Sequence, residues 1–116
     1  MNPNTPVIIG VGQILQRADD IASAKEPIEL MVDAAREAAE DAGVSAHLQN
    51  LDSVRVVRGR WRYKQPAGFI AEQLNAVQAE TMGTPFGGNS VQALLSESAA
   101  NILAGKNQFV LLSGAE

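Results

Sequence analysis

The residues best placed to do chemistry are Gly87, Gly88, Asn89 and Ser90, which lie directly before a helical pattern. Two adjacent glycines permit a sharp turn, and the free N–H groups at a helix start attract an anion or support a nucleophile. Asn89 or Ser90 can also cap the helix, because a short side-chain oxygen accepts a hydrogen bond from an N–H two or three residues on. The sequence therefore predicts a substrate- or anion-binding site at Gly88, Asn89 and Ser90.

The elements on either side of this turn have to position it. Apolar residues recur every three or four positions over 90–104, which predicts a helix, and Gly105 is expected to end it. The apolar run 108–112 predicts a buried strand that lies beside the others. The run 81–86 predicts a weaker strand before the turn. The predicted unit is strand, glycine turn, helix and strand.

The first eighty residues predict the same alternation. Apolar, β-branched residues over 7–11 predict a central parallel strand that is buried on both faces. A helix is expected to begin at Pro27 and to end at Gly43, followed by a strand over 51–57 and a short helix over 68–74. The order β-α-β-α-β-α-β predicts an α/β fold with a mainly parallel sheet.

A Gly-x-Gly pair, Gly10 and Gly12, ends the first predicted strand. A strand followed by such a pair is typical of dinucleotide binding, but Leu15 takes the place of the third glycine and no helix follows directly. The alternative is a tight turn at the end of the strand, which we favour.

Five of the nine basic residues lie between positions 55 and 64, with two aromatic residues among them. Guanidinium groups bind phosphates and aromatic rings stack on bases, so this stretch can contact a nucleotide. The same residue types are enriched at protein interfaces, and a solvated loop is a third explanation. An interface or a solvated loop is favoured over ligand contact, since neither needs a ligand. The candidates for either contact are Arg58, Arg60, Trp61 and Arg62.

The stretch GGNSVQALLSESAANILAG, followed by FVLLSGAE, resembles the thiolase superfamily. The family's pattern is a catalytic cysteine, small residues, a Leu/Val-Gln-Ala triplet, a long helix that ends in glycine, and a strand that ends Gly-Gly/Ala-Glu. The start, TPVIIGVGQ, resembles the first strand of the same family, above all its sterol-carrier-type branch, whose members are often labelled acetyl-CoA acetyltransferases.

This resemblance runs over nearly all 116 residues but covers only the first part of a thiolase subunit. It implies an incomplete N-terminal half of the fold, one partial domain over 1–116, with the sheet order 3-2-1-4. We therefore expect a fragment or a truncated open reading frame. The inner face of the helix over 90–104 would then be uncovered, so the chain should associate, swap segments or expose apolar surface. We expect a homo-oligomer.

The family's nucleophile falls on Gly87 when Val91-Gln92-Ala93 is aligned with the family triplet, and the sequence has no cysteine. Glycine has no side chain to hold an acyl group, so no thioester can form there.

Ser90 has no adjacent base in the sequence, and we assign it a capping role. The single histidine, His47, is expected to be a surface residue. We predict no catalytic residue in this chain.

The resemblance implies an acyl-CoA-handling protein of lipid metabolism that, lacking the cysteine, does no covalent acyl transfer as this chain alone. One alternative is a noncatalytic acyl-CoA-binding domain or partner subunit. Another is retro-aldol cleavage of a β-hydroxyacyl-CoA by the full-length protein, as in cysteine-less relatives that work with a small OB-fold partner. Most CoA contacts of thiolases come from regions beyond this chain, and no cofactor or metal is expected.

Composition and charge exclude several other classes of function. The net charge of −4 argues against nucleic-acid binding, which needs many basic residues to replace counterions. The longest apolar runs are far shorter than the ~20 residues that span a bilayer. No basic-then-apolar signal segment begins the chain. These features predict a cytoplasmic protein with no membrane association.

Overall fold

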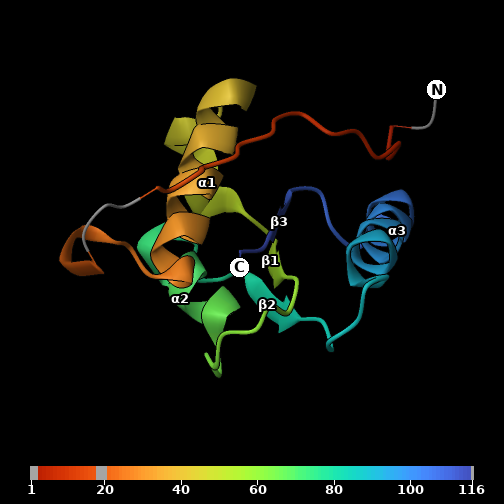
Figure 1. Ribbon diagram of the computed structural model, residues 1–116. Helices are drawn as coiled ribbons and strands as arrows, with labels where there is room; N and C mark the ends of the chain where they lie inside the picture. The colour runs from red at the N-terminus through yellow and green to blue at the C-terminus, as the bar shows by residue number, and fades with distance from the viewer. Residues whose placement is uncertain (1–2, 18–20, 116) are drawn as a thin grey trace.

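The computed structural model, which describes residues 3–17 and 21–115, is built on one three-stranded sheet (Figure 1). The strands are β1 (Ser53–Val56), β2 (Glu80–Gly83) and β3 (Val110–Ser113). Their order is β2-β1-β3, and both pairs are parallel. The predicted α/β class with a parallel sheet is confirmed.

Three α-helices cover the sheet: α1 (Pro27–Ala42), α2 (Pro66–Gln73) and α3 (Ser90–Leu103). Helices α1 and α2 contact each other on one side of the sheet, and α3 lies on the other side (Figure 1). Two short 3-10 helices, η1 (Ile21–Ser23) and η2 (Ser45–Asn50), lie in the connections. Within the part of the chain that the structure describes, no helix is both long and apolar enough to cross a membrane.

The helices begin and end at the residues that predicted their ends. Glu26 and Glu29 form a capping box at the start of α1, where Pro27 is the first helical residue. Gly43 (φ 73°) and Gly105 (φ 78°) both adopt the left-handed conformation just after a helix. Glycine reaches this conformation without a steric penalty, which explains why α1 and α3 end there.

The two faces of the central strand β1 differ in chemistry. Successive side chains of a strand point to opposite faces of the sheet. Val54 and Val56 are fully buried in the apolar core that α1 and α2 form with the sheet. Ser53 and Arg55 are just as buried but face α3, where a guanidinium N–H of Arg55 donates a hydrogen bond to Ser98 Oγ. The α3 side of the sheet therefore has a buried polar centre.

The segment 7–11 is not a strand, so the predicted order 3-2-1-4 is wrong. The second and fourth predicted strands, β1 and β3, pair directly with each other. Residues 7–11 form an extended segment that pairs with no described strand. The side chains of Val7, Ile8, Ile9 and Val11 are 54% to 73% exposed, so their predicted burial on both faces is wrong too.

The extended segment lies against α1 because Gly10 and Gly12 let its backbone approach the helix closely. A Cβ atom on Gly10 would lie 2.7 Å from the Cβ of Ala42, and one on Gly12 would lie 2.6 Å from the amide nitrogen of Ala38. Both glycines lie in extended chain with no turn, so the tight-turn interpretation is wrong. The Gly-x-Gly pair instead permits packing on α1.

Acidic side chains of α1 hold the same segment in place. The N–H of Val11 donates to Asp41 Oδ2 at 2.9 Å, and the N–H of Gln13 donates to Glu37 Oε1 at 3.3 Å. These bonds satisfy backbone donors that a sheet would otherwise satisfy. They give a physical reason why an apolar, β-branched segment lies on a helix.

We expect Gly12→Ala to detach the extended segment from α1. The added methyl group would collide with helix backbone, which cannot move aside cheaply, and such overpacking costs about 1–3 kcal/mol. Limited trypsin digestion at Arg17 should then be roughly tenfold faster than in the wild type. Gly88→Ala is the control, because a Cβ atom there meets nothing within 4 Å. Equal digestion rates for Gly12→Ala and the wild type would contradict this packing.

Candidate functional site

The carboxyl ends of β1 and β3 open onto a pocket of about 480 Å³. Val57, Arg58 and Gly59 line it from the end of β1, and residues 112–115 line it from the end of β3. Val91, in the first turn of α3, also faces it. Ligands of open α/β sheets bind outside the carboxyl ends of the strands, so this pocket is the candidate site.

The turn before α3 holds the residues that the sequence singled out, Gly87 to Ser90; the turn adjoins the pocket at Val91, but none of these four residues lines it. Gly87, Gly88 and Asn89 are exposed, whereas Ser90 is only 6% exposed. The hydroxyl of Ser90 donates to the carbonyl oxygen of Pro85 at 3.0 Å. Ser90 therefore ties the turn to the start of the helix.

Neither Asn89 nor Ser90 caps α3, so the predicted side-chain cap is wrong. Asn89 is the N-cap residue, but its side chain makes no capping hydrogen bond, and the Ser90 hydroxyl is turned back to Pro85. As a result, the N–H groups of Val91 and Gln92 have no acceptor among the described residues. Free N–H groups at a helix start are suited to an anion or a polarised carbonyl oxygen.

Position 87 has no side chain, and one would fit there only with a small shift of the Asn89 side chain. A Cβ atom on Gly87 would lie 3.3 Å from Asn89 Oδ1 and 3.5 Å from Ser90 Oγ, at the start of α3. The hydroxyl of Ser90 donates to the carbonyl oxygen of Pro85, which is not a base that could activate it. His47 is exposed on η2, which confirms that it is a surface residue. The described residues provide no activated nucleophile here.

Of the four candidate residues of the basic loop, Arg58 lines the pocket and Trp61 contacts one of its lining residues. Arg58 lines the pocket, and its backbone N–H donates to Thr84 Oγ1 at 3.0 Å. Trp61 supports the pocket from behind, because its indole N–H donates to the carbonyl oxygen of Ala115 at 2.9 Å. Arg60 and Arg62 are exposed and do not line the pocket. The structure therefore brings one guanidinium group to the candidate site.

Arg55 is a buried arginine whose role the sequence analysis missed. It is 1% exposed, and its guanidinium donates to Ser53 Oγ at 2.9 Å, to Ser98 Oγ at 2.9 Å and to Asn107 Oδ1 at 3.1 Å. It also lies 3.4 Å from Glu80 Oε1. Arg55 thus joins β1 to β2, α3 and the loop before β3. The alternation Ser53-Val54-Arg55-Val56, with polar residues on one face only, is the signal that could have identified it.

Among the described residues, the titratable groups with a shifted pKa, Lys25 and Tyr63, lie outside the candidate site. The hydrogen bond from Lys25 to Asp33 Oδ2 raises the pKa of the lysine. Partial burial raises the pKa of the Tyr63 hydroxyl, and the carboxylate of Glu26 raises it further. Over residues 3–17 and 21–115, no three His, Cys, Asp or Glu side chains come together to hold a metal ion.

Comparisons with known proteins find solved structures that resemble this chain. No protein-family model and no curated protein matches the chain. One solved structure that does match is the crystal structure of a monomeric SCP2-thiolase like protein type 1 from Mycobacterium smegmatis. The two chains are 32% identical with a TM-score of 0.84, and the match covers 98% of this chain and 24% of that one.

Two further structures share the fold at lower identity. The 3-oxoacyl-[acyl-carrier-protein] synthase III from Aquifex aeolicus VF5 is 23% identical, with a TM-score of 0.70 over 81% of this chain and 30% of that chain. The priming β-ketosynthase from the R1128 polyketide biosynthetic pathway is 22% identical, with a TM-score of 0.65 over 86% of this chain and 30% of that chain. The chain thus has a thiolase-like fold, and it spans 24% to 30% of the length of these three chains.

Proposed function

We propose that the chain belongs to a thiolase-like protein that binds an acyl-CoA at the candidate site without forming a covalent acyl intermediate. The observation that carries the proposal is the position of Gly87. It lies at the turn before α3, and the sequence has no cysteine. The likeness to the SCP2-thiolase like protein agrees with the thiolase resemblance of the sequence, and that resemblance implies an acyl-CoA ligand. Covalent acyl transfer needs a nucleophilic side chain, and position 87 has none.

The pocket has the chemistry that a thioester with an apolar acyl chain requires. Val57, Val91 and Leu112 supply apolar walls, and small-molecule sites are mostly apolar with a few placed polar groups. The free N–H groups at the start of α3 are suited to the thioester carbonyl oxygen. The guanidinium of Arg58 is exposed and is suited to a phosphate or carboxylate.

A retro-aldol reaction on a β-hydroxyacyl-CoA is the second candidate and stays a prediction. It needs a general base within hydrogen-bonding reach of the substrate hydroxyl. The pocket lining contains no histidine, aspartate or glutamate. Such an activity would therefore depend on groups outside the described chain, with or without a small OB-fold partner. Binding is the function that this chain supports best by itself.

We expect isothermal titration calorimetry to detect acetyl-CoA binding that Arg58→Ala weakens about fivefold to tenfold. Losing one charge-assisted hydrogen bond at an exposed site costs roughly 1–1.4 kcal/mol. Arg62→Ala is the matched control, because Arg62 is an exposed arginine of the same loop that does not line the pocket. The proposal is wrong if acetyl-CoA does not bind, or if both variants weaken binding equally.

A turnover assay separates binding from catalysis. We expect no thiolysis of acetoacetyl-CoA by the wild type or by Gly87→Cys, because a cysteine alone lacks the base that activates it. Robust wild-type turnover would contradict the noncovalent proposal.

A further inference from the structure

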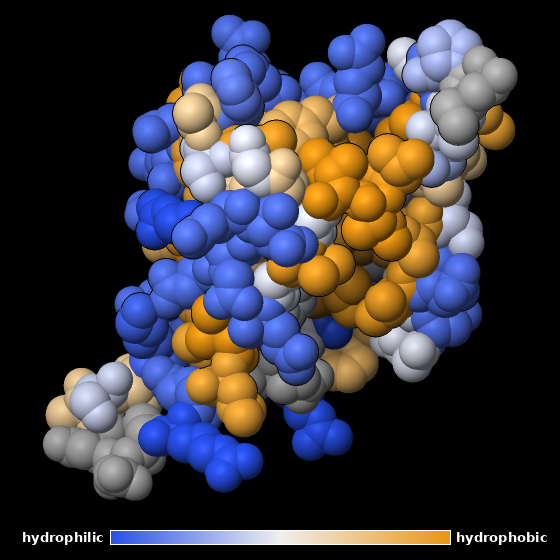
Figure 2. All heavy atoms as spheres, turned by 90° about the horizontal axis from the view of Figure 1, so that it is seen from above, coloured by the Kyte–Doolittle hydropathy of each residue, from blue (hydrophilic) through white to orange (hydrophobic). Residues whose placement is uncertain are grey.

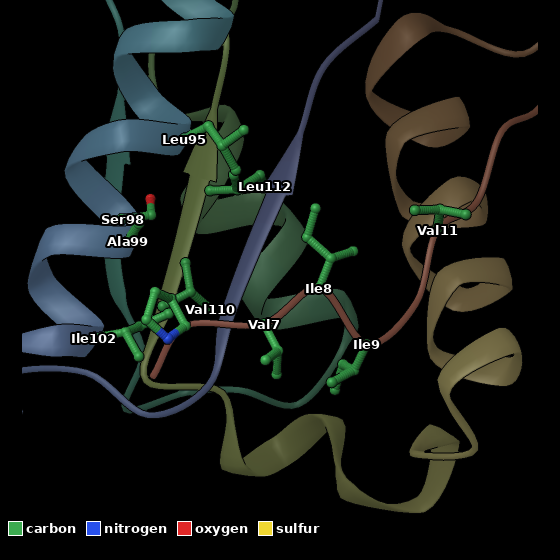
Figure 3. A pocket seen from close by; sticks show the side chains of 11 residues that line it. Val7, Ile8, Ile9, Val11, Leu95, Ser98, Ala99, Ile102, Val110 and Leu112 are labelled. Carbon is green, nitrogen blue, oxygen red and sulfur yellow. The ribbon is translucent and has the colours of Figure 1, made fainter. Parts of the chain in front are cut away.

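A cavity of about 400 Å³ lies beside the edge of β3 that pairs with no described strand. Figure 3 shows apolar side chains that point into it from residues 7–11, from α3 and from β3, and Figure 2 shows hydrophobic side chains gathered on one face of the molecule, with a hollow among them. Among the described residues that line this cavity, Ser98 alone has a polar side chain, and its hydroxyl accepts a hydrogen bond from Arg55. A site that fixes a ligand needs a few placed polar groups besides apolar walls. The polar contacts that position a ligand are therefore to be found at the candidate site.

The hydrogen bonds between β1 and β2 end at Thr84, one residue beyond β2. The N–H of Thr84 donates to the carbonyl oxygen of Val56 at 3.0 Å and so continues the parallel ladder. In a regular parallel ladder, the N–H of Arg58 would next donate to the carbonyl oxygen of Thr84. It donates instead to the Thr84 side chain, at Oγ1. The hydroxyl thus takes the place of the carbonyl oxygen, and the chain leaves the sheet at this residue.

The next residue, Pro85, begins the turn that leads to α3. A proline has no N–H to continue the ladder, and it disfavours the helical conformation at the residue before it. The carbonyl oxygen of Pro85 accepts the hydrogen bond from the Ser90 hydroxyl at 3.0 Å. Two adjacent residues therefore connect the two polar parts of the candidate site. Thr84 holds the backbone of Arg58, and Pro85 holds the first residue of α3.

The side chain of Arg58 is free, whereas its backbone is held. Its guanidinium makes no hydrogen bond or ion pair with a described residue, which leaves it available to a ligand. The bond to Thr84 is the one hydrogen bond that residue 58 makes within the described chain. Fixing a binding group before the ligand arrives strengthens binding, because less freedom is lost in the complex.

We propose that Thr84 is a positioning residue, whose hydroxyl holds the backbone of Arg58 so that its guanidinium lines the pocket. The inference rests on the proposed binding of acyl-CoA. It adds a residue that does not itself line the pocket. Thr84 acts on the ligand through Arg58, so its effect on binding should depend on whether the arginine is present.

A double-mutant cycle with acetyl-CoA, measured by isothermal titration calorimetry, tests this dependence. Thr84→Val removes the hydroxyl but keeps the branched shape, and it should weaken binding about threefold to fivefold. This loss is smaller than that of Arg58→Ala, because the guanidinium remains. In the Arg58→Ala background the same substitution should change the dissociation constant less than about twofold. A residue that only stabilised the fold would weaken binding equally in both backgrounds.

Two further variants control for the loss of the hydroxyl. Thr84→Ser keeps the hydroxyl and should bind acetyl-CoA as the wild type does. Thr81→Val is the matched control, since Thr81 is an exposed threonine of β2 whose side chain makes no hydrogen bond with a described residue. It should leave the affinity unchanged. Circular dichroism checks that each variant is folded.

Hydrogen exchange measures the contact itself, with no ligand present. The amide of Arg58 should exchange about fivefold faster in Thr84→Val than in the wild type or in Thr84→Ser, because its acceptor is lost. Equal exchange rates would overturn the proposal, whether or not acetyl-CoA binds.

The two measurements separate this proposal from the proposed function. If the wild-type chain binds no acetyl-CoA, the proposed function is wrong, and the exchange rate at Arg58 alone decides whether Thr84 holds that residue. If acetyl-CoA binds but Thr84→Val leaves the affinity unchanged, or lowers it equally with and without Arg58, the positioning role is wrong and the proposed function stands.

Discussion

Arg55→Ala is expected to lower the free energy of unfolding by about 3 kcal/mol or more. Leaving a buried polar group without its hydrogen-bond partner costs roughly 1–3 kcal/mol for each group. Arg55 is 1% exposed, and its loss would leave the hydroxyls of Ser53 and Ser98 buried without their donor. Because α3 contacts the sheet mainly through β3 and this network, the variant should loosen α3 in particular. Urea denaturation followed by circular dichroism measures the change.

Substitutions at the partners of Arg55 should lower the free energy of unfolding by different amounts. Ser98→Ala removes a buried acceptor and should cost about 1–3 kcal/mol. Glu80→Gln should cost less than about 1 kcal/mol, because the Glu80 side chain is 58% exposed and solvent screens the pair. Arg62→Ala, an exposed arginine, should stay within about 0.5 kcal/mol. An Arg55→Ala variant as stable as Arg62→Ala would show that the network does not hold α3.

Gly59→Val is expected to distort the candidate site and to destabilise the chain by about 2–3 kcal/mol, through overpacking. A Cβ atom on Gly59 would lie 2.5 Å from the carbonyl oxygen of Ala115 and would also collide with the indole nitrogen of Trp61. These are the two groups that form the hydrogen bond behind the pocket. Since Trp61 is the only tryptophan, its fluorescence reports on this change directly, and we expect an emission shift to longer wavelength.

Gly68→Ala is the control for this substitution. Gly68 lies within α2, and the nearest atom to a Cβ there is 3.9 Å away, so alanine fits. Alanine in a helix should stabilise the chain by about 0.5–1 kcal/mol relative to glycine. Unchanged Trp61 emission in Gly59→Val would contradict the packing of the indole against Ala115.

The unit around the glycine turn could be predicted from the sequence because its signals are local. Two local signals predict α3: the three- and four-residue spacing over 90–104 and the stop at Gly105. The predicted end lies one residue beyond the observed end, Leu103. The apolar run 108–112 overlaps β3, which is shifted by one or two residues. Helix periodicity and a left-handed glycine depend on neighbouring residues only. The thiolase resemblance rests on this unit and is confirmed by the comparisons.

The features that sequence reasoning missed depend on contacts between distant residues. The segment 7–11 has the composition of a buried strand, but Gly10 and Gly12 fit the backbone of α1. Composition does not show which element a segment packs against. The hydroxyl of Ser90 could cap α3 or bond to Pro85, and only the path of the preceding turn decides between them. The residues predicted for substrate binding at this turn stay predictions.

Mass spectrometry of the chain with acetyl-CoA tests the central claim, a thiolase-like scaffold that holds its ligand without a nucleophile. Under native conditions we expect one acetyl-CoA bound to each chain. Under denaturing conditions the same sample should return to the unmodified mass, because Gly87 has no atom to acylate and the Ser90 hydroxyl is bonded to Pro85. An acetyl adduct that survives denaturation and maps to Ser90 would contradict the account.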